Sequence, residues 1–145
     1  MPGIVVGVDG SGHSRQVLEW AVKEAALRNT SLTVLTVKET AGNAWTGHKE
    51  VYPGDQAEAD KMRQAAEEAT QKVVDAVGGP GPASVTVRAV SGIPAQEMVN
   101  ASNDADLVVV GARGGGGFAR LMLGSVSNQV AHYSAAPVVV IPVGR

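Results

Sequence analysis

The chain contains no cysteine and very few aromatic side chains. Without cysteine there is no disulfide, no thiolate nucleophile and no zinc site built on cysteine. Aromatic residues make up only 3% of the chain, so the core has to be built from valine, leucine, isoleucine and alanine. The lack of cysteine is consistent with a reducing compartment, and we expect the protein in the cytoplasm.

The chain also lacks an excess of positive charge and any long apolar segment. Its 12 basic and 14 acidic residues give a net charge of −2, which offers no basic face for nucleic acid. No apolar stretch approaches the roughly 20 residues that cross a bilayer, and the N-terminus does not resemble a signal peptide. We therefore expect a soluble protein with neither a nucleic-acid nor a membrane partner.

What the sequence does contain is an alternation of apolar, β-branched segments with helical patterns. At 145 residues it is long enough for one well-cored domain, which we expect to span residues 1–145. The predicted strands are Ile4–Val8, Ser31–Val37, Ser84–Val90, Leu107–Val110 and Pro137–Val143. The predicted helices between them begin near Ser14, Asp55, Pro94 and Val126. Residues 38–54 show no clear period and are expected to form a long loop.

This order predicts an α/β fold with a five-stranded parallel sheet and helices on both faces. In such sheets ligands bind at the carboxyl ends of the strands, where the strand order changes direction. Glycine follows both the first and the fourth predicted strand. We expect these two strand ends to be neighbours at the binding crevice.

The most informative segment begins at Gly111, directly after a buried strand. Gly111 is followed by Gly114, then by nine residues, and then by Gly124-Ser125 at the start of a helix. Glycine lets the backbone approach an anion closely, and a helix N-terminus offers unpaired N–H groups with a partial positive charge. The segment therefore predicts a site for an anionic ligand, and we expect a nucleotide; a glycine-rich turn without a ligand is the alternative.

The segment is neither of the two common nucleotide motifs. No Gly-Lys-Ser/Thr occurs, so it is not a Walker A loop, and the glycines after the first strand have the wrong spacing for a dinucleotide fingerprint. Phosphate would instead be held by backbone N–H groups, Ser125 and Arg113 or Arg120, with Mg²⁺ supplying further positive charge. The three histidines show no metal-ligand spacing, so no protein metal site is expected.

Several motifs together resemble the universal stress protein family. They are Gly111-x2-Gly114-x9-Gly124-Ser125 with its flanking strands, the opening Val5–Ser11, and Ser91–Pro94 before the third helix. The resemblance covers the whole chain and keeps the order of its parts. It implies a Rossmann-like, adenine nucleotide alpha hydrolase-like sheet with strand order 3-2-1-4-5, counting the five predicted strands.

The resemblance also implies an ATP site, because the complete glycine pattern marks the nucleotide-binding branch of the family. Asp9 would accept hydrogen bonds from the ribose hydroxyls, which suits a carboxylate facing a sugar diol. The backbone of Val37 would meet the edge of the adenine. From the residues alone Asp9 has a second interpretation, because aspartate after a strand often caps a turn or helix.

The remaining implied contacts are to ribose and phosphate. Gly111 and Gly114 would pass close to both, and Gly124, Ser125 and Val126 would cradle phosphate at the helix start. The expected nucleotide contacts are Asp9, Gly10, Ser11, Val37, Gly111, Arg113, Gly114, Gly124, Ser125 and Val126.

The function implied by the resemblance is that of an ATP-binding stress regulator or protective factor, with Mg²⁺ and an unknown protein partner. No catalytic residue is assigned, because no general base is evident beside the phosphates, but slow ATP hydrolysis remains open. The alternatives are a weak ATPase or nucleotidyl transferase, a protein that binds AMP or cyclic AMP, and a nucleotide-free interaction protein. The apolar strand Val138–Ile141 is expected at a sheet edge, where members of the family commonly pair into homodimers.

Overall fold

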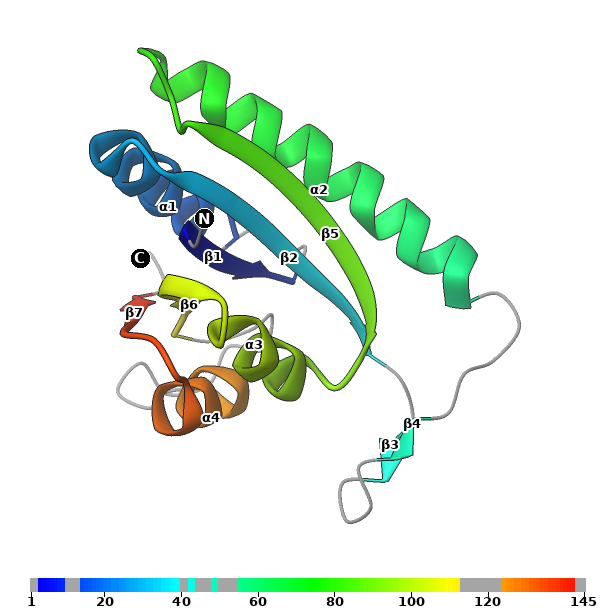
Figure 1. Ribbon diagram of the computed structural model, residues 1–145. Helices are drawn as coiled ribbons and strands as arrows, with labels where there is room; N and C mark the ends of the chain where they lie inside the picture. Colours follow the sequence, from blue (N-terminus) through cyan, green and yellow to red (C-terminus); the bar gives the residue numbers. More distant parts are fainter. Residues whose placement is uncertain are drawn as a thin grey trace.

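A computed structural model describes residues 3–9, 14–39, 42–43, 48–49, 55–112 and 124–142. Its main feature is a five-stranded sheet with the order β5-β2-β1-β6-β7, in which all neighbouring strands are parallel (Figure 1). The strands of this sheet are β1 (Gly3–Val8), β2 (Ser31–Glu39), β5 (Ser84–Gly92), β6 (Ala105–Gly111) and β7 (Val138–Ile141).

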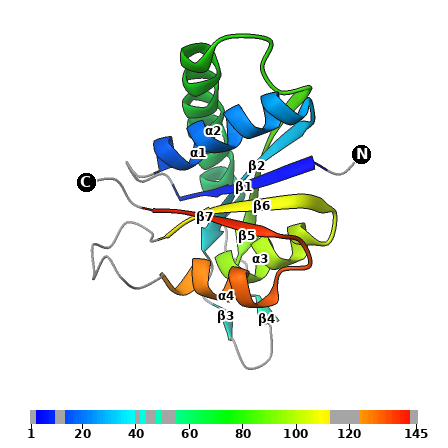
Figure 2. The ribbon, with the colours of Figure 1, turned by 90° about the vertical axis from the view of Figure 1, so that its left-hand side faces the viewer.

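Two pairs of helices cover the two faces of the sheet (Figure 2). The pair on one face is α1 (Ser14–Arg28) and α2 (Asp55–Val77), and the pair on the other is α3 (Pro94–Ser102) and α4 (Ser125–Tyr133). Each face has its own buried cluster. Ile4 and Val6 of β1 pack with α1 in one cluster, while Val5 packs with Met98 of α3 in the other.

The local sequence explains this layering. Successive side chains of a strand point to opposite faces, so a strand between two helix layers must be apolar on both sides. In β6 the residues Leu107–Val110 are all buried, and in β1 burial covers Gly3–Val6. The buried face of α1 consists of Val17, Leu18, Ala21, Val22 and Ala25, which recur at helical spacing.

The predicted fold class is confirmed. Counted along the five strands of the main sheet, the observed order is 3-2-1-4-5, with helices on both faces and the last strand at an edge. The prediction of a long irregular loop after Val37 was wrong in part. Strand β2 continues to Glu39 because β5 pairs with it as far as Gly92, and β3 (Gly42–Asn43) and β4 (His48–Lys49) form a short antiparallel pair.

Candidate functional site

A cavity of about 440 Å³ opens at the carboxyl ends of β1, β2 and β6. We call it the carboxyl-end cavity. Its walls also include the first residues of α1, the first turns of α3 and the start of α4. The strand order reverses here, because β1 leads outward to β2 on one side while β6 lies on its other side. This is the position at which open α/β sheets bind ligands.

The floor of the cavity depends on the absence of a side chain at Gly7. A Cβ on Gly7 would lie only 2.8 Å from Sδ and 3.0 Å from Cε of Met98. Both residues line the cavity, and Met98 is 3% exposed. Glycine in β1 therefore leaves the space that the end of the Met98 side chain occupies.

Asp9 lies at the end of β1, where it contacts the first residue of α1. The Ser14 hydroxyl donates to Oδ1 of Asp9 at 3.0 Å, and the Asp9 backbone N–H donates to the same hydroxyl oxygen at 3.3 Å. The carboxylate thus orders the entry to α1, as its alternative interpretation suggested. A carboxylate offers about four acceptor positions, so this contact is compatible with a ligand bonding to the same group.

The two ends of the glycine segment are tied together. The backbone N–H of Gly124 donates to the carbonyl of Ala112 at 2.5 Å. The buried hydroxyl of Ser127 lies 2.9 Å from the same carbonyl and 3.1 Å from the carbonyl of Gly124. These bonds place the start of α4 directly beside the end of β6.

The start of α4 forms part of the cavity wall. Gly124 occupies the N-cap position in an extended conformation and makes no side-chain cap, and the first turn carries no acidic residue. Gly124, Ser125 and Val126 all line the cavity, and the last two are exposed. An uncapped helix N-terminus with a hydroxyl at its first position suits an anionic group.

Strand β2 supplies the far end of the cavity through alternate residues. Leu35, Val37 and Glu39 line the cavity. Lys38 points the other way, and its Nζ lies 3.2 Å from Oε2 of Glu58 on α2. This alternation follows from the strand geometry and leaves an acidic side chain, Glu39, beside Val37.

Six of the ten predicted contacts line this one cavity: Asp9, Val37, Gly111, Gly124, Ser125 and Val126. The other four, Gly10, Ser11, Arg113 and Gly114, lie outside the described residues. Sequence reasoning missed Gly7, Ser14, Glu39, Pro94, Met98 and Ser127, which also line it. Alternation from Val37 would have pointed to Glu39, but the contribution of Met98 depends on how α3 packs against the sheet.

Within the described ranges, neither a metal cluster nor a membrane span is found. No group of three His, Cys, Asp or Glu side chains there could hold a metal ion. No described helix combines the length and the apolar character that crossing a membrane requires.

Comparison with known proteins decides the family. The model of the universal stress protein family matches residues 2–142. The chain belongs to the universal stress protein family. A universal stress protein of Mycobacterium tuberculosis is 37% identical over 139 residues, which cover 96% of this chain and 47% of that protein. The chain therefore spans about half the length of the curated relatives it matches.

Solved universal stress proteins share the fold. One from Lactobacillus plantarum has a TM-score of 0.76 at 24% identity, with 97% of each chain covered. A universal stress protein in complex with cAMP has a TM-score of 0.67 at 26% identity, covering 97% and 96% of the two chains. One from Archaeoglobus fulgidus in complex with dAMP has a TM-score of 0.65 at 25% identity, covering 97% and 98%. Some structural neighbours of this universal stress protein thus bind adenine nucleotides.

Proposed function

We propose that this universal stress protein binds ATP in the carboxyl-end cavity and acts as a nucleotide-responsive stress regulator or protective factor. The observation that carries the proposal is the convergence of residues from four separate segments. Asp9, Val37, Gly111 and the Gly124–Val126 turn all line one cavity at the strand ends. Its volume of about 440 Å³ falls in the range of small-molecule sites. The complexes of neighbours with cAMP and dAMP support an adenine nucleotide as the ligand.

The two ends of the cavity suit the two ends of a nucleotide. The apolar wall from Leu35, Val37 and Val110 suits a base, and the carboxylate of Asp9 suits the ribose hydroxyls. The start of α4 suits phosphate, with Gly111 and the undescribed Gly10, Ser11, Arg113 and Gly114 as further contacts in the proposal. Backbone N–H groups and the Ser125 hydroxyl are donors of the kind that phosphate binds.

Mg²⁺ would be held mainly by the phosphates rather than by the protein. The Ser127 hydroxyl is held by two backbone carbonyls, so the α4 end offers the Ser125 hydroxyl and N–H groups, which fit phosphate oxygens better than a metal. Mg²⁺ commonly keeps several waters and binds through substrate phosphates, so this donor set is compatible with it. When bound, the ion would neutralise part of the phosphate charge.

The role of Asp9 can be tested with an analogue that lacks the ribose hydroxyls. We expect Asp9→Ala to weaken ATP binding about tenfold, while 2′,3′-dideoxyATP should bind the variant and the parent protein equally. The analogue is needed because the substitution also removes the bond to Ser14 and loosens the start of α1. An equal loss of affinity for both nucleotides would assign Asp9 to α1 alone.

Two of the alternatives to ATP binding also involve a nucleotide. In a weak ATPase or nucleotidyl transferase, purified protein would turn over nucleotide clearly faster than a Ser125→Ala variant. In a protein that prefers AMP or cyclic AMP, those ligands would displace ATP at lower concentration. We favour binding over catalysis, and we propose no catalytic residue.

We further propose that two copies pair through β7. This strand forms one edge of the main sheet, and all four of its side chains, Val138–Ile141, are apolar and only partly buried. An apolar edge strand is a template for another chain. The matched relatives are about twice as long, so a dimer would have a size similar to theirs.

Val140→Lys should give a monomer in sedimentation equilibrium, and an unchanged mass would reject pairing through this strand. The cytoplasm remains the proposed location.

A further inference from the structure

We propose that the opposite face of the sheet carries a second ligand site, which binds a small molecule with an apolar body and one negatively charged group. The site is a cavity of about 500 Å³ between α1, α2 and the ends of β1 and β2. We call it the α1–α2 cavity. It shares Val8, Asp9 and Ser14 with the carboxyl-end cavity, so the end of β1 separates the two.

Small residues on α2 create this space. Ala65, Ala66 and Ala69 line the cavity, with Met62 and Val73 at the same helical spacing on either side. Ala66 is buried, whereas Ala65 and Ala69 are exposed, so three short side chains leave open a space beside α2 that larger side chains would narrow. Leu18 of α1 completes an apolar wall. The body of a ligand bound here would therefore be apolar.

A buried hydroxyl lies on the floor of the cavity. Thr36 of β2 lines it and is only 3% exposed. Among the described residues, Thr36 is not one whose side-chain oxygen is both shut off from solvent and without a partner. Its hydroxyl borders the cavity and can donate to or accept from a bound molecule, which makes it a candidate contact for a ligand.

The charge at the mouth is arranged for an anion. Arg15 lies in the first turn of α1, where a cation is unfavourable beside the positive end of the helix dipole. Lys72 of α2 faces the same cavity. Neither makes an ion pair with a described residue. A bound anion would relieve the unfavourable position of Arg15.

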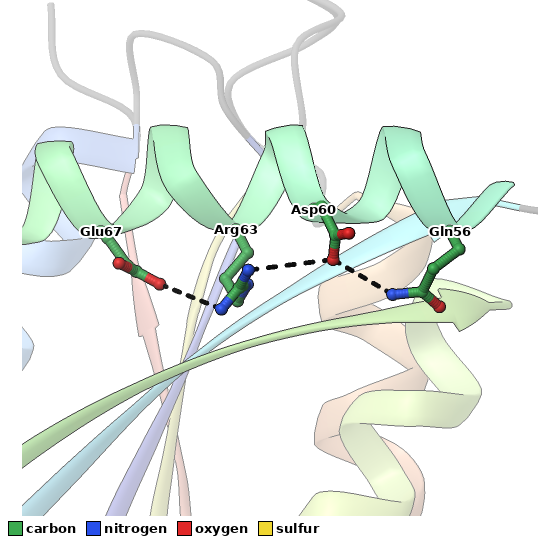
Figure 3. A network of polar contacts seen from close by, with 4 residues as sticks. All are labelled: Gln56, Asp60, Arg63 and Glu67. Carbon is green, nitrogen blue, oxygen red and sulfur yellow. Dashed lines mark hydrogen bonds and ion pairs between the residues drawn. The ribbon is translucent and has the colours of Figure 1, made fainter. Parts of the chain in front are cut away.

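Other charged residues of α2 are arranged differently. Figure 3 shows a continuous series along the helix in which Arg63 lies between Asp60 and Glu67, with N–O distances of 3.9 and 3.7 Å, and Gln56 donates to Asp60 at 3.1 Å. These groups satisfy one another on a different face of α2. Lys72 is not part of this series and is therefore available to a ligand.

The acids of the α1–α2 cavity limit the charge of that ligand. Glu68 lies at the mouth, one turn before Lys72, and Asp9 lies in the shared wall, where its carboxylate accepts from Ser14. The two cations and the two acids sum to zero, so the partial positive charge at the start of α1 is the only excess, and it favours at most one negative charge. A monoanion such as an alkanoate fits this balance better than a phosphate dianion.

The test uses decanoate, kept below its micelle concentration, with uniformly ¹⁵N-labelled protein. We expect saturable shifts in the backbone amides of Thr36 and of the Met62–Val73 stretch of α2. Decyltrimethylammonium, which has the same chain and the opposite charge, should give none. Saturating ATP should leave the decanoate shifts in place. Displacement by ATP would put the probe in the carboxyl-end cavity and overturn the proposal.

Matched variants separate this site from unspecific binding to α2. Ala69→Leu should abolish the shifts by filling the cavity, whereas Ala76→Leu, also exposed on α2 but outside the cavity, should not. Lys72→Gln should weaken binding about tenfold, the usual effect of removing a charge-assisted contact. The proposal is rejected if decanoate produces no saturable shift, or if Ala69→Leu and Ala76→Leu bind it equally. The saturable decanoate shifts and the comparison of Ala69→Leu with Ala76→Leu do not depend on whether ATP binds the other cavity.

Discussion

Two serines that lie two residues apart in α4 should have opposite roles, and the same substitution distinguishes them. Ser127 is 2% exposed, and its single hydroxyl proton is shared between the carbonyls of Ala112 and Gly124 at 2.9 and 3.1 Å. Ser125 is exposed and lines the carboxyl-end cavity. Ser127→Ala should therefore affect folding stability, and Ser125→Ala should affect nucleotide binding.

The loss of stability expected for Ser127→Ala depends on the hydrogen bonds that its two acceptor carbonyls retain. The Ala112 carbonyl retains the N–H of Gly124 at 2.5 Å, and the Gly124 carbonyl retains the N–H of Asn128 at 2.9 Å. Neither carbonyl becomes unsatisfied, so the loss should be close to the net value of one hydrogen bond, about 1 kcal/mol, rather than the ~3 kcal/mol of an orphaned group. Ser125→Ala should change the free energy of unfolding by less than about 0.5 kcal/mol.

Urea unfolding followed by far-ultraviolet circular dichroism measures both values. ATP titration of the same samples should show about a tenfold loss of affinity for Ser125→Ala, the usual effect of removing a hydrogen bond to a charged group. Equal stability of the two variants would refute the role given to the Ser127 hydroxyl. Unchanged ATP affinity in Ser125→Ala would refute the placement of phosphate at the start of α4.

Two further substitutions test the packing around the cavities. Gly7→Ala should push the flexible end of Met98 toward the carboxyl-end cavity, because the new Cβ would lie 2.8 Å from Sδ. ATP affinity should fall while the urea midpoint changes little. Unchanged affinity would show that the Met98 side chain moves away from the cavity rather than into it. Thr70→Val should raise the free energy of unfolding by about 1 kcal/mol or more, because the buried Thr70 hydroxyl has no hydrogen-bond partner among the described residues. Thermal unfolding at a lower temperature than the parent would contradict this.

The fold could be predicted because its signals are local and periodic. The face of α1 formed by Val17, Leu18, Ala21, Val22 and Ala25 follows the helical repeat, and each predicted strand is a short β-branched run. Strand order is not a local property. It came from a family resemblance, which the sheet order confirms.

The parts of the site that could not be predicted depend on contacts between distant segments. The hydrogen bond from Ser127 to Ala112 joins residues that are 15 positions apart in the sequence, and the contact of Met98 with Gly7 joins α3 to β1. Thr36 resembles any threonine in a strand until α2 leaves a cavity above it. Such features are decided by how helices pack on the sheet, which side-chain periodicity does not specify.

The most direct test of the central claim is a calorimetric titration of the protein with ATP in the presence of Mg²⁺, after any co-purified nucleotide has been removed. The account predicts saturable binding of about one ATP per chain, weakened in Ser125→Ala. Absence of binding heat across several temperatures, in folded and nucleotide-free protein, would contradict it and favour a nucleotide-free interaction protein.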